Sequence, residues 1–153
     1  MQWKFNTIST VILVTGLFFI ITWMPQNVYA DNSDVDYNAL SWKAENLNVQ
    51  QKYQQVIDLL KPYVEDKKNK SVNFFNELGT AYFNKQDNLN ANKYFSIAHQ
   101  LNKNDPKIIY NLASSIALLE NYEEALKLFD LAESKGFDKR LINEWRVWLK
   151  EKK

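Results

Sequence analysis

Two consecutive stretches of this 153-residue chain decide its fold, because one can be written above the other without a gap. Residues 72–105 read VNFFNELGTAYFNKQDNLNANKYFSIAHQLNKND, and residues 106–139 read PKIIYNLASSIALLENYEEALKLFDLAESKGFDK. Seven apolar or small residues recur 34 positions apart: Phe75/Ile109, Leu78/Leu112, Gly79/Ala113, Tyr82/Ile116, Ala91/Ala125, Phe95/Phe129 and Ala98/Ala132. A period of this length indicates stacked copies of one supersecondary unit.

The apolar residues within each copy follow the spacing of two helices. Phe75, Leu78 and Tyr82 fall at i, i+3 and i+7, which places them on one face of a first helix. Ala91 and Phe95, at i and i+4, begin the same pattern in a second helix. The sequence therefore predicts one helical hairpin in each copy.

Residues that favour helix ends separate these segments. Polar N-caps are expected at Ser71, Asp87 and Asp105, and Asn121 with Glu124 predicts a capping box. Gly136 is expected to end a helix in the left-handed conformation. Pro62 should kink or shorten a helix that the pattern places at about residues 53–65.

The spacing of both copies resembles the tetratricopeptide repeat (TPR), whose pattern is W-x2-L-G-x2-Y followed by A-x3-F and a later proline. Phe75 replaces the tryptophan in one copy and Ile109 in the next, and Lys103 and Phe137 replace the prolines. The resemblance implies an all-α fold, a right-handed α-solenoid of about three TPR hairpins with a C-terminal capping helix. It covers about residues 37–139.

A weaker copy at about residues 37–71 precedes the two clear repeats, at about 72–105 and 106–139. A shift of 35 places Leu40 over Phe75 and Leu60 over Phe95. Residues 138–153 follow as an amphipathic segment whose apolar positions are Leu141, Ile142, Trp145, Trp148 and Leu149. We interpret it as the capping helix that covers the last hydrophobic face. The alternative is that its two tryptophans dock a partner or a membrane surface.

The first helices of stacked hairpins line a concave face, so their exposed positions form the candidate partner-binding groove. Side-chain amides there would pair with a polypeptide backbone, and aromatic residues would supply apolar anchors. The groove residues predicted in the two clear repeats are Asn73, Asn76, Thr80, Phe83, Asn84, Lys107, Tyr110, Asn111, Ser114 and Leu118. Some TPR proteins read a C-terminal carboxylate with basic residues on these helices. This chain offers only Lys107 and Asn111 in comparable places, so that role is not expected.

Residues 1–30 have the pattern of a secretory signal peptide. Lys4 precedes an uncharged apolar run at residues 8–23, and Val28, Tyr29 and Ala30 form a small-x-small exit. Cleavage after Ala30 would leave a TPR domain at residues 31–153 in the periplasm or outside the cell. The alternative is an uncleaved anchor that holds the chain in the inner membrane and faces the periplasm.

Composition argues against several classes of site. The chain has no cysteine and one histidine, His99, which excludes thiolate metal sites and leaves no histidine cluster. The net charge of +1 does not favour a nucleic-acid partner. Asp31, Asp34 and Asp36 lack the glycine turn and the distal glutamate of an EF-hand. No catalytic, cofactor-binding or metal-binding residues are therefore expected.

The leading functional hypothesis is a non-enzymatic scaffold or adaptor of a cell-envelope complex, which binds a partner polypeptide in the groove. The alternative is a membrane-tethered accessory subunit that uses residues 8–23 as an anchor and Trp145 and Trp148 for assembly. An enzyme would have to depend on His99. The sequence leaves the partner and the oligomeric state open.

Overall fold

The computed structural model describes residues 35–152, and these residues form helices without any strand. The elements are α1 (Tyr37–Val49), α2 (Tyr53–Leu60), the short 3-10 helix η2 (Lys61–Tyr63), α3 (Val72–Asn84), α4 (Asn88–Leu101), α5 (Pro106–Leu118), α6 (Tyr122–Ser134) and α7 (Lys139–Lys150). The predicted all-α class is confirmed. The expected leader at residues 1–30, together with Asp31 and Asp34, lies outside the described residues.

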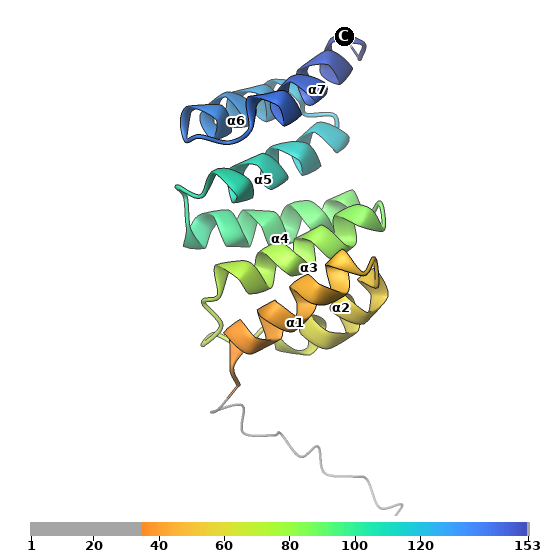
Figure 1. Ribbon diagram of the computed structural model, residues 1–153, viewed down its shortest axis with the longest axis vertical. Coiled ribbons are helices and arrows are strands. Elements are labelled where there is room, and N and C mark those ends of the chain that lie inside the picture. The colour runs from red at the N-terminus through yellow and green to blue at the C-terminus, as the bar shows by residue number, and fades with distance from the viewer. Residues whose placement is uncertain (1–34, 153) are drawn as a thin grey trace, which may run out of the picture. The chain divides into compact units, whose positions relative to one another are not determined.

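The helices of residues 35–152 stack in chain order (Figure 1). Three hairpins, α1 with α2, α3 with α4 and α5 with α6, pack against one another through the contacts of α2 with α3 and of α4 with α5. The helices α1, α3, α5 and α7 also touch in succession, so they form a continuous row. This is the architecture of an α-solenoid, in which each hairpin buries its apolar face against its neighbours.

Each hairpin turns through one residue in the left-handed conformation. Gln51, Gln86 and Glu120 have φ values of 58°, 62° and 65°, and each lies between the two helices of its hairpin. The residue that follows donates its backbone N–H to a carbonyl five residues earlier, as Asp87 does to Tyr82 at 3.0 Å. This bond satisfies a carbonyl group that the end of the helix would leave without a partner.

The predicted helix ends are mostly confirmed. The side chains of Ser71, Asp87 and Asp105 accept hydrogen bonds from backbone N–H groups of the first turns of α3, α4 and α5. The capping box at Asn121 is wrong in detail, because its side chain accepts from no backbone group and its Nδ2 donates instead to the Glu124 carboxylate at 2.6 Å.

Pro62 shortens its helix as predicted. The helix α2 ends at Leu60, and Pro62 lies in the short 3-10 helix that follows. Proline lacks the N–H that an α-helix needs at this point. Gly136 has a φ of +94°, which agrees with its predicted role after α6.

The core consists of the repeated apolar columns. Phe74, Phe95 and Phe129 are among the largest fully buried side chains, and the alanines paired at positions 91/125 and 98/132 are completely buried. Gly79 faces the ring of Phe95, and a Cβ atom at this position would lie 2.6 Å from the ring carbon Cδ1. Glycine is therefore required by the close approach of α3 to α4.

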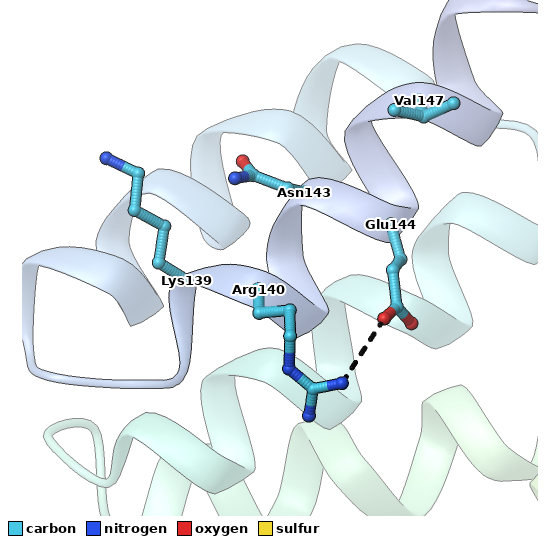
Figure 2. Close-up of a pocket in the computed structure, with 5 residues that line it drawn as sticks. All are labelled: Lys139, Arg140, Asn143, Glu144 and Val147. Atoms are coloured by element: carbon cyan, nitrogen blue, oxygen red, sulfur yellow. Dashed lines mark ion pairs between the residues drawn. The ribbon is translucent and has the colours of Figure 1, made fainter.

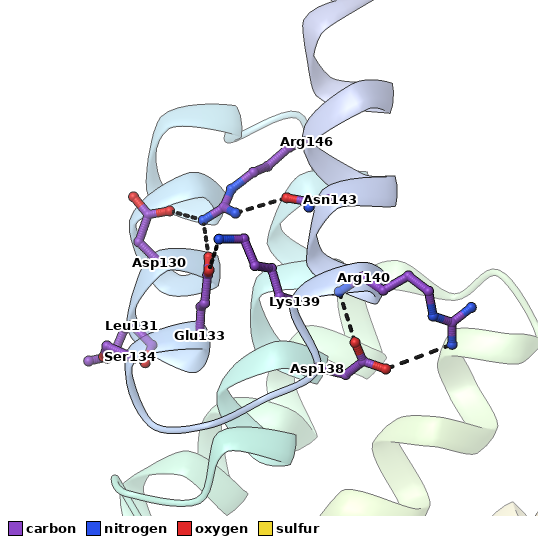
Figure 3. Close-up of polar contacts among 9 residues, drawn as sticks. All are labelled: Asp130, Leu131, Glu133, Ser134, Asp138, Lys139, Arg140, Asn143 and Arg146. Atoms are coloured by element: carbon purple, nitrogen blue, oxygen red, sulfur yellow. Dashed lines mark hydrogen bonds and ion pairs between the residues drawn. The ribbon is translucent and has the colours of Figure 1, made fainter.

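The last helix, α7, covers the end of the stack. Ile142 and Leu149 are buried, and Trp145 and Trp148 pack half-buried against the core. The guanidinium group of Arg146 binds the carboxylates of Asp130 and Glu133 on α6, at 2.5 and 2.7 Å (Figure 3). The predicted capping helix is thus observed. Its apolar face packs on the hairpins, and a polar edge that contains Arg146 forms ion pairs with α6.

The carboxylate of Glu133 is the centre of this polar edge. It accepts from Arg146 and also lies 3.1 Å from the ammonium group of Lys139, at the start of α7 (Figure 3). The hydrogen bond from Arg146, and after it that from Lys139, lowers the pKa of Glu133. The carboxylate therefore stays ionised at neutral pH and keeps both contacts with α7.

Candidate functional site

A small cavity opens on the row of first helices, between α3, α5 and α7. It has a volume of about 240 Å³ and is lined by Thr80, Phe83, Asn84, Phe95, Tyr110, Asn111, Ser114 and Trp145. Four of these side chains are aromatic, and the other four are polar without a charge. We call this site the aromatic cavity. Sites with an apolar wall and a few polar groups are typical of places where a ligand is held and oriented.

Six of the ten predicted groove residues meet at the aromatic cavity: Thr80, Phe83, Asn84, Tyr110, Asn111 and Ser114. The other four do not line it. Asn73 and Lys107 are exposed near the starts of α3 and α5, and Leu118 is half-buried at the end of α5. Of the predicted groove, the part that forms a cavity is therefore limited to the middle and last turns of α3 and α5, next to α7.

The prediction that Asn76 is an exposed groove position is wrong. Its side chain is 2% exposed, because it points from α3 toward α5. It forms hydrogen bonds with Glu77 of its own helix and with Asn111 of α5. Its Nδ2 donates to Glu77 at 2.9 Å, and its Oδ1 accepts from Asn111 at 2.8 Å. Ser114 is also buried, although it borders the cavity, and its hydroxyl donates to the Tyr110 carbonyl.

These bonds belong to a ladder of polar side chains that joins three first helices. Asn48 of α1 donates to the Glu77 carboxylate of α3 at 2.8 Å, and Asn76 and Asn111 continue the ladder to α5. Glu77 is 6% exposed. We call Asn48, Glu77, Asn76 and Asn111 the amide ladder. Because the bonds of Asn48 to Glu77 and of Asn111 to Asn76 cross helix interfaces, the ladder ties each hairpin to the next.

Trp145 of α7 closes the cavity from the other side. Its indole N–H donates to the Tyr110 hydroxyl at 3.0 Å, and its ring stacks on Phe129 with centroids 5.7 Å apart. Tyr110 itself stacks on Phe137, with centroids 4.2 Å apart. Both rings at the cavity are therefore held in place by their neighbours, which is the condition for a rigid binding surface.

Two residues of the aromatic cavity, Phe95 and Trp145, were not among the predicted groove residues, although Trp145 was named in the alternative in which the last helix docks a partner. Phe95 was expected in the core, where it is indeed buried, but its side chain also lines the cavity. For Trp145 a signal was available, since Ile142, Trp145 and Leu149 have the spacing of the first-helix residues Ile109, Leu112 and Ile116. The helix α7 thus takes the place of a further first helix in the row.

His99 lies on α4 and does not line the aromatic cavity. Burial, and after it the charge of Lys103, lowers the pKa of His99, and its Nδ1 has no hydrogen-bond partner among the described residues. Residues 35–152 contain no group of three or more histidine, aspartate or glutamate side chains placed to hold a metal ion. Asp36, the one described member of the N-terminal aspartates, caps α1.

A wider hollow, of about 720 Å³, lies on the outer side of α7 (Figure 2). Its five lining residues are Lys139, Arg140, Asn143, Glu144 and Val147, and all of them belong to this one helix. Lys139 extends away from the others, and Arg140 is paired with Glu144 at 3.8 Å. A surface without a second wall cannot enclose a ligand, so the aromatic cavity is the better candidate despite its smaller volume.

No helix within residues 35–152 has both the length and the apolar character needed to cross a membrane. This finding leaves the predicted anchor at residues 8–23 untouched, because that segment lies outside the described residues.

Comparison with solved structures supports the fold. No family model matches the sequence, and a search of curated proteins also finds no match. Among solved structures, the chain is similar to the first TPR of Spaghetti (RPAP3) bound to the HSP90 peptide SRMEEVD, with a TM-score of 0.66 and 20% identity over 75% of this chain and 90% of that one. It is also similar to a chain of the CopN–Scc3 complex, with a TM-score of 0.59 and 18% identity over 86% and 81%. The described chain therefore has the fold of a tetratricopeptide-repeat array.

Proposed function

We propose that this protein is a non-enzymatic interaction module that binds a segment of a partner polypeptide at the aromatic cavity. The observation that carries the proposal is the convergence of Phe83, Tyr110 and Trp145 with uncharged polar groups on one open face. Aromatic side chains in such pockets supply most of the energy of protein–protein recognition. The amides beside them provide both donors and acceptors for a backbone.

The similar structures support a protein partner. One of them is a TPR bound to a peptide, and the other comes from a complex of two proteins. Stacked hairpins commonly bind partners on the concave side lined by their first helices, and in this chain the row of first helices is α1, α3 and α5, continued by α7. The binding surface of this chain would therefore use the same side of the fold.

We further propose that the protein acts in the cell envelope, in the periplasm or beyond it, as part of a larger complex. This part of the proposal rests on the pattern of residues 1–30. Intact-mass measurement of the protein from its own cells would decide between a cleaved leader and an anchor. Loss of residues 1–30 would support a cleaved signal peptide. Retention of the full mass would instead support an uncleaved membrane anchor at residues 8–23.

The binding proposal is tested by capture with paired bait variants. The full chain, Phe83→Ala and Trp42→Ala are used as baits under identical conditions. Phe83 lines the cavity, whereas Trp42 lies on α1 and is 70% exposed. We expect one stoichiometric partner with the wild-type chain and with Trp42→Ala, and its loss with Phe83→Ala. A partner that is kept by Phe83→Ala but lost by Trp42→Ala would move the binding surface to α1 and contradict the proposal.

A further inference from the structure

The amide ladder fixes the direction of every hydrogen bond along it. Both carboxylate oxygens of Glu77 accept a hydrogen bond from a side-chain amide, one from Asn48 and the other from Asn76. Asn76 must therefore turn its NH2 group toward Glu77 and its oxygen toward Asn111. Asn111 in turn gives its NH2 group to Asn76, at 2.8 Å.

Asn111 is the member of the ladder that lines the aromatic cavity, and its Oδ1 oxygen is left for a ligand there. The Oδ1 of Asn48 also has no partner among the described residues, but it is buried and Asn48 does not line the cavity. No group among residues 35–152 donates a hydrogen bond to the Asn111 Oδ1, although the Asn111 side chain lines the aromatic cavity. A free asparagine can rotate its amide and present either a donor or an acceptor. Here rotation would break the bond to Asn76, so the cavity presents a hydrogen-bond acceptor at this position.

Tyr110 next to it presents the opposite polarity. The indole nitrogen of Trp145 can only donate, and it donates to the Tyr110 hydroxyl oxygen. The hydroxyl hydrogen of Tyr110 is therefore available to a ligand that accepts. The cavity thus offers an acceptor on Asn111 and a donor on Tyr110, and both orientations are set by neighbours within the protein.

The lining of the cavity carries no charge. It contains no lysine, arginine, aspartate or glutamate side chain. A charged ligand group would lose part of its hydration there without gaining an ion partner, which costs free energy. The peptide SRMEEVD of the similar TPR structure has two glutamates and an aspartate, so this cavity does not suit a peptide of that kind.

We infer that the aromatic cavity recognises an uncharged apolar side chain together with a neighbouring peptide group, whose N–H donates to Asn111 and whose carbonyl accepts from Tyr110. The inference rests on the proposed function and names the chemistry of the segment that it binds. The rings of Phe83, Phe95 and Trp145 surround the apolar side chain. An acidic segment is rejected because no cation lies at the site.

Three small probes with the same ring test this inference. Indole-3-propionamide has an amide N–H and a carbonyl, its N,N-dimethyl derivative lacks the amide N–H, and indole-3-propionate carries a carboxylate. Each is titrated into the full chain while the backbone and side-chain amide signals are followed by NMR. The affinity is read from the signals of Thr80, Asn84, Asn111 and Ser114.

We expect the primary amide to bind about threefold to tenfold more tightly than the dimethyl amide, which corresponds to one net hydrogen bond. The carboxylate should bind more weakly than the primary amide. In Glu77→Gln, the ladder no longer has an acceptor-only group at its centre, so the preference for the N–H amide should fall below about twofold. Glu124→Gln is the matched control, because Glu124 also accepts from an asparagine, Asn121, but does not belong to the amide ladder.

Equal binding of the two amides to the wild-type chain would overturn the inference, and so would tighter binding of the carboxylate. Probe-induced shifts confined to other surfaces, or no shifts at all, would also overturn it. The comparison within the wild-type chain decides the question even if Glu77→Gln does not fold. The proposed function is tested separately by the bait variants, since a partner lost on Phe83→Ala would uphold it whatever the probes show.

Discussion

Gly79 lies against the ring of Phe95 so closely that a methyl group at position 79 would approach two ring carbons to 2.6 and 2.7 Å. The ring is buried, and it also helps to line the aromatic cavity. The packing of α3 on α4 and the shape of the candidate site therefore depend on the same contact.

We predict that Gly79→Ala destabilises the protein by about 1–3 kcal/mol, the usual cost of adding a methyl group to a filled core. The displaced Phe95 ring should also narrow the cavity, so the variant should bind indole-3-propionamide more weakly. Urea unfolding and the NMR titration measure the two effects. Unchanged stability would mean that the helices separate more easily than the structure indicates.

The third hairpin supplies the control for this substitution. Ala113 occupies the position equivalent to Gly79, and it is completely buried. We expect Ala113→Gly to destabilise by about 1 kcal/mol, because glycine lowers helix propensity there. This change adds no atoms and should leave probe binding at the cavity close to the wild-type value. Weakened binding in both variants would point to a general loss of order.

Trp145 has two separable roles, which two substitutions distinguish. Trp145→Phe keeps a ring for stacking on Phe129 but removes the N–H that binds Tyr110, so we expect a loss of about 0.5–1.5 kcal/mol. Trp145→Ala removes both contacts. Because Trp145 is half-buried, its cost should stay below the roughly 3–5 kcal/mol of a fully buried tryptophan. Thermal unfolding gives the ranking, and equal losses for the two variants would contradict it.

His99 should make stability depend on pH. Burial and, after it, Lys103 lower its pKa in the folded state below the ordinary value of 6.5. The unfolded chain then binds more protons than the folded one below pH 6.5, so stability is full above that pH and falls as the folded pKa is approached. We predict that the urea midpoint decreases between pH 7 and pH 5, and that it decreases less in His99→Gln. Parallel curves for the two proteins would contradict the prediction.

The repeat itself could be predicted from the sequence because its signal is periodic. The paired columns at a distance of 34 are filled by residues that the structure buries, and the N-caps Ser71, Asp87 and Asp105 are short polar residues just before them. Both patterns reflect local geometry, namely one helix face and one helix end. Such information is present in a single sequence.

The hairpin turns could not be predicted in the same way. Their left-handed positions hold Gln51, Gln86 and Glu120 rather than glycine or asparagine, so they carry no local mark. Among the described residues with positive φ, Gly136 is the one whose residue type predicts the left-handed conformation. The regular packing of neighbouring hairpins imposes the turns, and that packing is a tertiary effect.

The candidate site could be predicted only in part, because the register identifies helix faces but not side-chain contacts between helices. Its first-helix members followed from the register, but the burial of Asn76 depends on Glu77 and Asn111, which meet it through the ladder. The cavity role of Trp145 depends on Tyr110, 35 residues earlier in the chain. Periodicity shows which face a residue occupies, whereas side-chain pairing across helices requires the three-dimensional arrangement.

The most direct test of the central claim, that a polypeptide binds at the aromatic cavity, is site-specific photocrosslinking in the native cells. A photoreactive side chain replaces Asn84 at the cavity in one protein, and the exposed Lys127 on α6 in another. We predict a single crosslinked partner from position 84 that disappears when Phe83→Ala is added, and none from position 127. Crosslinking of the same partner from position 127 but not from position 84 would contradict the account.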